Sequence, residues 1–151
     1  MVILDTNILL YAHMPMFDQH RAVKNWLEDE LSMGVETLGL TWQAAASFLR
    51  IGTNRRVFEK PCDLDFAIKC LEDLYSHPGV SEVGPTKNHW VTYSTILREQ
   101  NLVGDDVMDA RITAIAVEHK AAIATVDKGF RRFLDYVRIV DPTANKEGKK
   151  K

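Results

Sequence analysis

The chain has 151 residues, of which 46% are hydrophobic and 26% are charged, so it is long enough for one domain with a substantial core. Its formal net charge of −2 argues against a simple polyanion-binding module, which is normally basic. It does not exclude an enzyme whose carboxylates hold cations while it acts on nucleic acid. The apolar run near the N-terminus is broken by Asp5, and Cys62 and Cys70 lack zinc-type spacing. We therefore expect a cytoplasmic protein with unreactive thiols, no signal peptide and no membrane span.

The opening stretch, Met1–Ala12, predicts a strand that turns directly into a helix. Its VIL segment suits a buried strand, the DTN that follows favours a turn and a helix cap, and the next apolar residues suit a packed helix. Such a junction leaves the residue after the strand at the carboxyl edge of a sheet, where open α/β folds bind their ligands. Asp5 is therefore a candidate site residue.

Helices and strands alternate along the rest of the chain. Helical spacing of apolar residues predicts helices at Asp18–Met33, Trp42–Ile51, Leu64–Tyr75, Thr86–Gln100, Val107–His119 and Lys128–Leu134. Short apolar runs predict strands at Thr37–Thr41, Val80–Val83, Ala121–Val126 and Tyr136–Val140. In the helix that begins at Thr86, one face is expected to carry Trp90, Tyr93, Ile96 and Leu97.

This alternation predicts an α/β sandwich around a mostly parallel sheet. We expect one domain over residues 1–142. Residues 143–151 are rich in lysine and poor in apolar residues, so they are expected to form a disordered tail.

Further aspartates are placed to join Asp5. Asp127 also follows a buried strand and precedes a helix, so a parallel sheet would bring it to the same edge. Asp109 lies in the first turns of the helix that leads into that strand, and Asp105 or Asp106 could share its face. Carboxylates that meet in this way repel one another unless protons or cations intervene, and all-oxygen ligands suit Mg²⁺ or Mn²⁺. Such ions can activate water and stabilise a phosphodiester transition state.

Each aspartate also has a plainer interpretation. Asp5 and Asp127 could do no more than cap the helices that follow them, and Asp109 could be an ordinary exposed helix residue. Asp105 and Asp106 could be N-terminal charges that favour the helix dipole. The coincidence of Asp5, Asp109 and Asp127 at one predicted edge favours a shared site over three separate explanations.

Two stretches resemble a known family. VILDTNILLYA at residues 2–12 and DARITAIAVEHKAAIATVDKGFRRF at residues 109–133 look like PIN-domain ribonucleases, most closely the VapC-type toxins of VapBC toxin–antitoxin systems. LTWQAAASFLRIGTNRRVF at residues 40–58 is similar to one bacterial branch, and the resemblance covers about Met1–Pro142. It implies a three-layer α/β/α fold and a Mg²⁺- or Mn²⁺-dependent endoribonuclease. It also implies a VapB-type antitoxin partner and a homodimer, for which Asp18–Met33 and Leu64–Tyr75 offer apolar residues.

The resemblance assigns roles to three of these carboxylates. Asp5, Asp109 and Asp127 match three of the four acidic residues that the family usually places around the metal, so they are implied to be catalytic and metal-binding. The other position, usually a glutamate on the helix after the second strand, is Ser47 here. Serine can hold a metal-bound water but supplies no negative charge. Either Asp105 or Asp106 provides the missing carboxylate, or the site binds metal weakly and cuts slowly.

Polar and basic residues near these positions could support the site. Three stand next to the strand-end aspartates and could orient them or hold the water shell of a metal, or be ordinary turn residues: Thr6, Asn7 and Thr125. Five arginines could contact RNA phosphates, or be solvated surface charges: Arg50, Arg55, Arg56, Arg131 and Arg132.

Two other functions stay open at this point. Haloacid-dehalogenase-like phosphatases also begin with a strand-end aspartate, but they need a second aspartate two residues later, where this chain has Asn7. With Ser47 in place of the family's acid, the chain could instead be a degenerate PIN domain that binds RNA or a protein without catalysis. The presence of Asp5, Asp109 and Asp127 argues against that loss.

Overall fold

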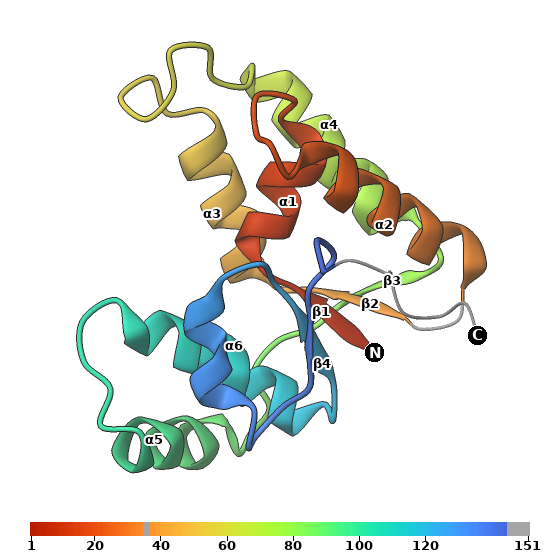
Figure 1. The fold of residues 1–151 in the computed structure, drawn as a ribbon. Coiled ribbons are helices and arrows are strands. Elements are labelled where there is room, and N and C mark those ends of the chain that lie inside the picture. The colour runs from red at the N-terminus through yellow and green to blue at the C-terminus, as the bar shows by residue number, and fades with distance from the viewer. Residues whose placement is uncertain (35–36, 145–151) are drawn as a thin grey trace.

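The computed structural model describes residues 1–34 and 37–144, and five short strands form its central sheet (Figure 1). In chain order the strands are β1 (Val2–Leu4), β2 (Leu38–Leu40), β3 (Val80–Glu82), β4 (Ala122–Ala124) and β5 (Ile139–Val140). Their order in the sheet is β3-β2-β1-β4-β5, and each neighbouring pair is parallel. The three inner strands are buried throughout, as parallel strands covered on both faces require. The predicted α/β fold with a parallel sheet is confirmed.

Helices cover both faces of this sheet and complete three layers (Figure 1). One face carries α1 (Thr6–His13), α2 (His20–Met33), α3 (Trp42–Gly52) and α4 (Leu64–Ser76). The other carries α5 (His89–Glu99), α6 (Asp106–Glu118) and the 3₁₀-helix η1 (Lys128–Phe133). Successive side chains of β1 alternate between the two cores: Val2 and Leu4 belong to the first, and Ile3 to the second. The three-layer α/β/α architecture is therefore present.

The fifth helix differs most from its predicted form. It begins at His89 rather than Thr86, because the residues between them form a turn in which the His89 N–H donates to the Thr86 carbonyl (3.1 Å). Trp90, predicted to share a helix face with Tyr93, is 69% exposed. Its ring meets Tyr93 edge-on at the rim, with 6.4 Å between the ring centroids.

The last strand is shorter than the predicted Tyr136–Val140. The N–H groups of Tyr136 and Val137 both donate to the Phe133 carbonyl, at 2.9 and 3.0 Å, so this backbone continues the turn after η1 and pairs only from Ile139 onward. The strand predicted at Ala121–Val126 is likewise limited to the three residues of β4. Residues 145–151 of the predicted tail lie outside the described residues.

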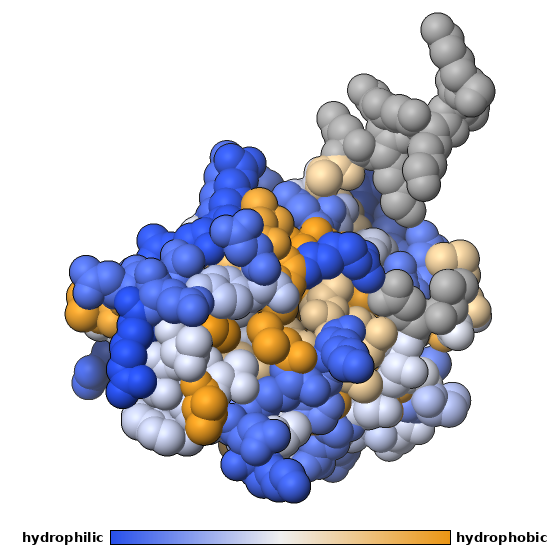
Figure 2. Space-filling model, turned by 90° about the horizontal axis from the view of Figure 1, so that it is seen from below, coloured by the Kyte–Doolittle hydropathy of each residue, from blue (hydrophilic) through white to orange (hydrophobic). Residues whose placement is uncertain are grey.

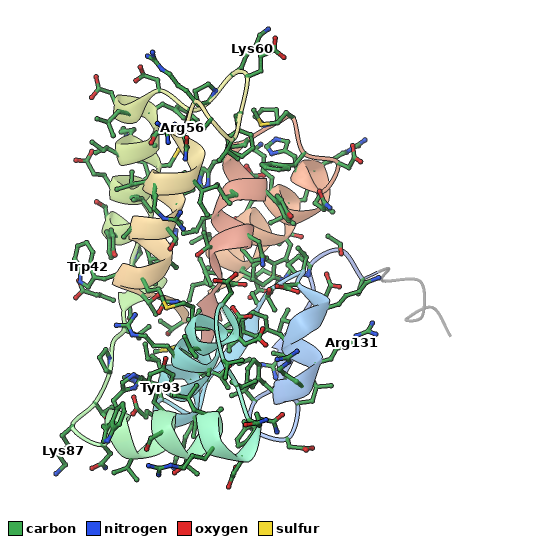
Figure 3. The ribbon with its side chains drawn as sticks, turned by 90° about the vertical axis from the view of Figure 1, so that its left-hand side faces the viewer. Trp42, Arg56, Lys60, Lys87, Tyr93 and Arg131 are labelled. Atoms are coloured by element: carbon green, nitrogen blue, oxygen red, sulfur yellow. The ribbon has the colours of Figure 1, made fainter. Side chains whose placement is uncertain are left out.

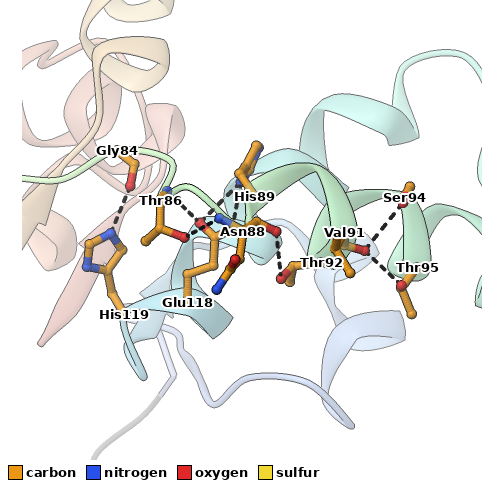
Figure 4. Close-up of polar contacts among 10 residues, drawn as sticks. All are labelled: Gly84, Thr86, Asn88, His89, Val91, Thr92, Ser94, Thr95, Glu118 and His119. Atoms are coloured by element: carbon orange, nitrogen blue, oxygen red, sulfur yellow. Dashed lines mark hydrogen bonds and ion pairs between the residues drawn. The ribbon is translucent and has the colours of Figure 1, made fainter.

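A polar cluster joins α5 to the end of α6 (Figure 4). The buried Glu118 carboxylate accepts from the Thr86 N–H (3.2 Å) and lies 3.2 Å from His89 Nδ1. His119 Nε2 lies 2.8 Å from the carbonyl oxygen of Gly84. These contacts fix the connection between β3 and α5 against the C-terminal end of α6.

The outer surface carries both hydrophobic and hydrophilic residues. The face seen from below, the side on which α5 lies in Figure 1, shows separate hydrophobic patches among hydrophilic residues (Figure 2). Within residues 1–34 and 37–144, no helix combines the length and apolar character needed to cross a bilayer.

Candidate active site

The two strand-end aspartates, Asp5 and Asp127, follow β1 and β4 at the carboxyl edge of the sheet. Asp5 follows β1 directly, and its N–H donates to the Ala124 carbonyl of β4 (3.1 Å). Asp5 Oδ1 accepts from the Thr6 N–H (2.7 Å), and Asp127 Oδ1 accepts from the Gly129 N–H (2.7 Å). Both aspartates therefore cap the helices that follow, as their plainer interpretation predicts. Each cap hydrogen bond occupies only one carboxylate oxygen.

A hydrogen-bonded network holds the second oxygen of Asp5. Asp5 Oδ2 accepts from Asn7 Nδ2 and from the hydroxyl of Thr125, both at 2.8 Å. Asn7 Oδ1 in turn accepts from the Val126 N–H (3.3 Å), and Thr125 Oγ1 accepts from the Asp127 N–H (3.1 Å). The network thus connects the ends of β1 and β4. Of the three predicted supporting residues, Asn7 and Thr125 orient Asp5 through their side chains, and Thr6 does so through its backbone.

The three aspartates act on one another electrostatically. Burial raises the pKa of the Asp5 carboxyl, hydrogen bonds from Thr125 and Thr6 oppose that rise, and the charge of Asp127 adds to it. The pKa of Asp109 is raised to about 6, chiefly by burial and then by the charges of Asp5 and Asp127. The helix α6 therefore carries Asp109 within electrostatic range of the other two carboxylates.

Of the two candidates for a further carboxylate, Asp106 is the one that acts on Asp109. Its negative charge also raises the pKa of Asp109, whereas the positive charge of Arg132 lowers it. Arg132 Nη1 donates to Asp106 Oδ2 at 2.7 Å. Asp105 precedes α6, makes no side-chain capping hydrogen bond and is exposed.

The donor chemistry of this edge fits a hard divalent cation. Asp5, Asp109 and Asp127 offer only oxygen, which suits Mg²⁺ or Mn²⁺ rather than zinc. Bound positive charge would offset the repulsion that raises the pKa of Asp109. Across the described parts of the chain, however, no three His, Cys, Asp or Glu side chains are grouped so that they could hold a metal ion as they stand.

The helix α3 contributes a residue that sequence reasoning missed. Ser47, predicted to stand at the family's second acidic position, is partly exposed. Gln43, one turn earlier, reaches α6 instead: its Nε2 donates to the Met108 carbonyl (3.3 Å) and its Oε1 accepts from Arg111 Nη1. Gln43 therefore fixes α3 against the backbone next to Asp109. Gln43 lies four residues before Ser47 and so on the same face of the helix, and this spacing could have identified it from the sequence.

A third aspartate at a strand end, Asp141, directly follows β5. No helix follows it within the described residues, so the strand-to-helix pattern that selected Asp5 and Asp127 does not mark it. With Asp127 it lines two neighbouring cavities of about 610 and 200 Å³.

The predicted phosphate-binding arginines lie in two places. Arg50 is in the last turn of α3, and Arg55 and Arg56 follow that helix. All three are exposed, and they lie at the end of α3 that is remote from β2, as the position of Arg56 in Figure 3 illustrates. Arg131 lies in η1, well apart from Arg56 in the same view. Contact of these residues with RNA stays a prediction.

Comparison with known proteins places this chain in a family. The model of the PIN domain matches residues 2–134. VapC ribonuclease Mb2897 of Mycobacterium bovis is 33% identical over 133 residues, which cover 88% of this chain and 90% of that protein. Ribonuclease VapC25 of Mycobacterium tuberculosis is 35% identical over 144 residues, which cover 94% of this chain and 99% of that protein.

Solved structures share the fold at lower identity. VapBC2 from Rickettsia felis, bound to a DNA fragment from its promoter, has a TM-score of 0.66 and 18% identity, covering 92% of this chain and 96% of that one. VapBC-1 from nontypeable Haemophilus influenzae has a TM-score of 0.63 and 21% identity, covering 94% and 98%. The family model and the curated relatives each span most of the sequence, and the chain therefore belongs to the PIN-domain family, within its VapC ribonuclease group.

Proposed function

We propose that this chain is an endoribonuclease toxin that cleaves RNA with Mg²⁺, or with Mn²⁺ in its place, at Asp5, Asp109 and Asp127. The observation that carries the proposal is that Asp109 is partly buried within reach of the charges of Asp5 and Asp127, and burial followed by these charges raises its pKa to about 6. Three acidic groups held together at a sheet edge are costly without a cation, so their arrangement is suited to binding one. The phosphatase alternative fails because the chain is a PIN domain.

Each residue has a task in this proposal. Asp5 is held by Asn7 and Thr125, so it presents a fixed carboxylate. Asp127 is held by the Gly129 N–H, and Asp109 approaches from α6. A divalent cation bound there supplies an activated water and stabilises charge on the phosphate. Asp106 is the candidate for the fourth carboxylate of the site. It forms an ion pair with Arg132 and lies one turn before Asp109 on α6.

Partners and location follow from the same family. The similar solved structures are VapBC complexes, and they support a VapB-type antitoxin as the partner of this chain. A cytoplasmic location is part of the proposal. A homodimer is also part of the proposal. Apolar residues on the outside of α4 are available for such protein contacts: Leu64 is 56% exposed, Phe66 50% and Ile68 38%.

The test is cleavage of a panel of structured RNAs by the purified protein with Mg²⁺, with Mn²⁺ and with EDTA. Asp5→Asn and Asp109→Asn should each reduce cleavage by at least about a hundredfold, because each removes a charge from the site, while circular dichroism shows an intact fold. Asp135→Asn is the control, since Asp135 is exposed and lies after η1.

The outcomes separate the alternatives. Metal-dependent cutting that is lost in Asp5→Asn establishes the nuclease. An undiminished rate in Asp5→Asn or Asp109→Asn rejects the assigned site. RNA binding without any cutting by the folded wild-type protein would favour the degenerate, non-catalytic PIN domain.

A further inference from the structure

The cavity of about 610 Å³ lies beside the acidic site and has no part in the function proposed above. It opens between the start of η1, the end of β5, α1 and the residue that precedes α2. Two residues of the acidic site, Asn7 and Asp127, line it. Its volume is within the range of roughly 300–1,000 Å³ that is typical of small-ligand pockets. A group bound there would be next to the reacting phosphate.

The polar groups that line this cavity are held in place, and the contacts of the described residues leave one Asp141 oxygen, Oδ2, to accept from a ligand. Asp141 Oδ1 accepts from the N–H and the hydroxyl of Thr143, at 2.8 and 2.7 Å, and these bonds fix the orientation of the carboxylate. Gln19 precedes α2 but makes no side-chain hydrogen bond to cap it, so its helix does not occupy its amide. Both side chains line the cavity.

The same cavity offers one aromatic ring and one cation. Tyr11 packs edge-on against Phe17, with ring centroids 4.7 Å apart and an interplanar angle of 64°. Lys128, next to Asp127, is exposed. Both line the cavity.

These groups match the chemistry of an unpaired nucleotide. Sequence-specific RNA recognition uses aromatic rings to contact splayed bases, and amide and carboxylate groups to bind base edges. A carboxylate needs N–H donors, as when Asp or Glu accepts from a base amine. Guanine presents an imino and an amino donor side by side, whereas uracil has a single imino donor. A lysine at the rim suits a backbone phosphate.

We propose that this cavity is the subsite for an unpaired base next to the cleaved phosphate, and that Asp141 makes guanine the preferred base. The proposal rests on the nuclease function proposed above. It identifies the substrate as single-stranded or looped RNA, because a base inside a duplex cannot enter the cavity. Gln19 and Asp141 are its specificity residues.

Binding tests the subsite without cleavage. Chemical-shift titrations of the full chain with the four ribonucleoside 5′-monophosphates should show the guanosine nucleotide binding about tenfold more tightly than the uridine nucleotide, the discrimination expected of a two-donor contact. Asp141→Asn should reduce this ratio to about twofold, because the amide oxygen would stay with the two Thr143 donors and the amide NH2, itself a donor, would face the guanine donors in place of Oδ2. Asp135→Asn makes the same charge change outside the cavity and should preserve the ratio.

Equal binding of all four nucleotides, or a ratio unchanged in Asp141→Asn, overturns the proposal. So does the absence of any nucleotide binding, which would instead favour a protein segment as the occupant. If Asp141→Asn fails to fold, Gln19→Leu provides the second variant, with a loss of guanine preference expected.

Cleavage of a randomised RNA pool separates this proposal from the nuclease itself. The wild-type protein should cut with guanine enriched at one nucleotide flanking the cut, and Asp141→Asn should remove that enrichment. Cutting without any base enrichment rejects the subsite but leaves the nuclease standing. Guanine-selective binding with no cutting rejects the nuclease but leaves the subsite standing.

Discussion

Single aspartates in this protein serve the fold and the site together. Asp5 caps α1 through Oδ1 and is fixed by Asn7 and Thr125 through Oδ2. The cap and the site therefore do not compete, because they use different oxygens of the same carboxylate. Asp109 differs, since it gains no comparable hydrogen bonds and carries the cost of nearby negative charge. It is the residue at which the requirements of stability and of metal binding conflict most directly.

Replacing Asp109 should stabilise the metal-free protein. In the folded state its pKa is raised from 3.8 to about 6, so above pH 6 the fold bears the cost of an ionised carboxylate that the unfolded chain does not. Asp109→Asn should therefore raise the free energy of unfolding at pH 7–8 by about 1–2 kcal/mol, a value discounted for partial exposure. Urea denaturation in EDTA at several pH values measures this.

The stability difference between Asp109→Asn and the wild-type protein should depend on pH. As the pH falls from about 6 toward 3.8, the folded wild-type protein takes up the proton first, the cost disappears, and the two proteins should converge. Mg²⁺ should stabilise the wild-type protein more than the variant, because it binds the folded state. A variant that is less stable than the wild-type protein at pH 8 without metal would refute the assigned repulsion.

At the scale of elements, apolar spacing is enough to predict most segments but not their ends. The run VIL and the helices Trp42–Ile51 and Leu64–Tyr75 match β1, α3 and α4 to within a residue at each end. The start of α5 could not be predicted, because it depends on a local turn at Thr86 and on the contact of Glu118 with His89.

The candidate site follows a similar division. Asp5 and Asp127 were predictable because a strand-to-helix junction is a local pattern. The strand order β3-β2-β1-β4-β5 is not local, and neither is the link between Gln43 and Arg111, which joins α3 to α6. Asp141 was overlooked because no helix follows β5 in the part of the chain that the structure describes, so this pattern does not mark it.

The close packing of β2 gives a test at this scale. A Cβ added to Gly39 would lie 3.0 Å from side-chain atoms of both Ile3 and Val83. Gly39→Ala should therefore lower the free energy of unfolding by about 1–3 kcal/mol, because a buried strand between two neighbours cannot easily move. Thermal or urea denaturation measures the loss.

Gly84 is the matched control, since a Cβ there meets nothing within 4 Å. Gly84→Ala should change the free energy of unfolding by no more than about 0.5 kcal/mol. Equal effects at the two glycines would show that backbone entropy, rather than crowding at β2, dominates.

In the molecule as a whole, the central strand β1 is buried in both cores, whereas the outer helix α5 is attached through few buried residues. The central strand β1 sends Val2 and Leu4 into one core and Ile3 into the other, and all three are at most 3% exposed. The helix α5 buries only Ser94 and Ile96. Its attachment depends on packing against α6 and on the contacts of Glu118 with Thr86 and His89.

This inequality predicts two levels of opening in native-state hydrogen exchange. The amides of β1 should exchange only through global unfolding, with a free energy of opening equal to that measured in urea, because exposing them disrupts both cores. The amides of α5 should open at a lower free energy, since releasing the helix exposes little buried surface.

Glu118→Gln should lower the free energy of opening of α5 further, by about 1 kcal/mol, because it weakens charge-assisted hydrogen bonds at the start of α5. The amides of β1 should be unaffected unless global stability falls equally. If α5 is as protected as β1 in the wild-type protein, the molecule unfolds as one unit, and the contacts of α5 contribute more than its buried residues indicate.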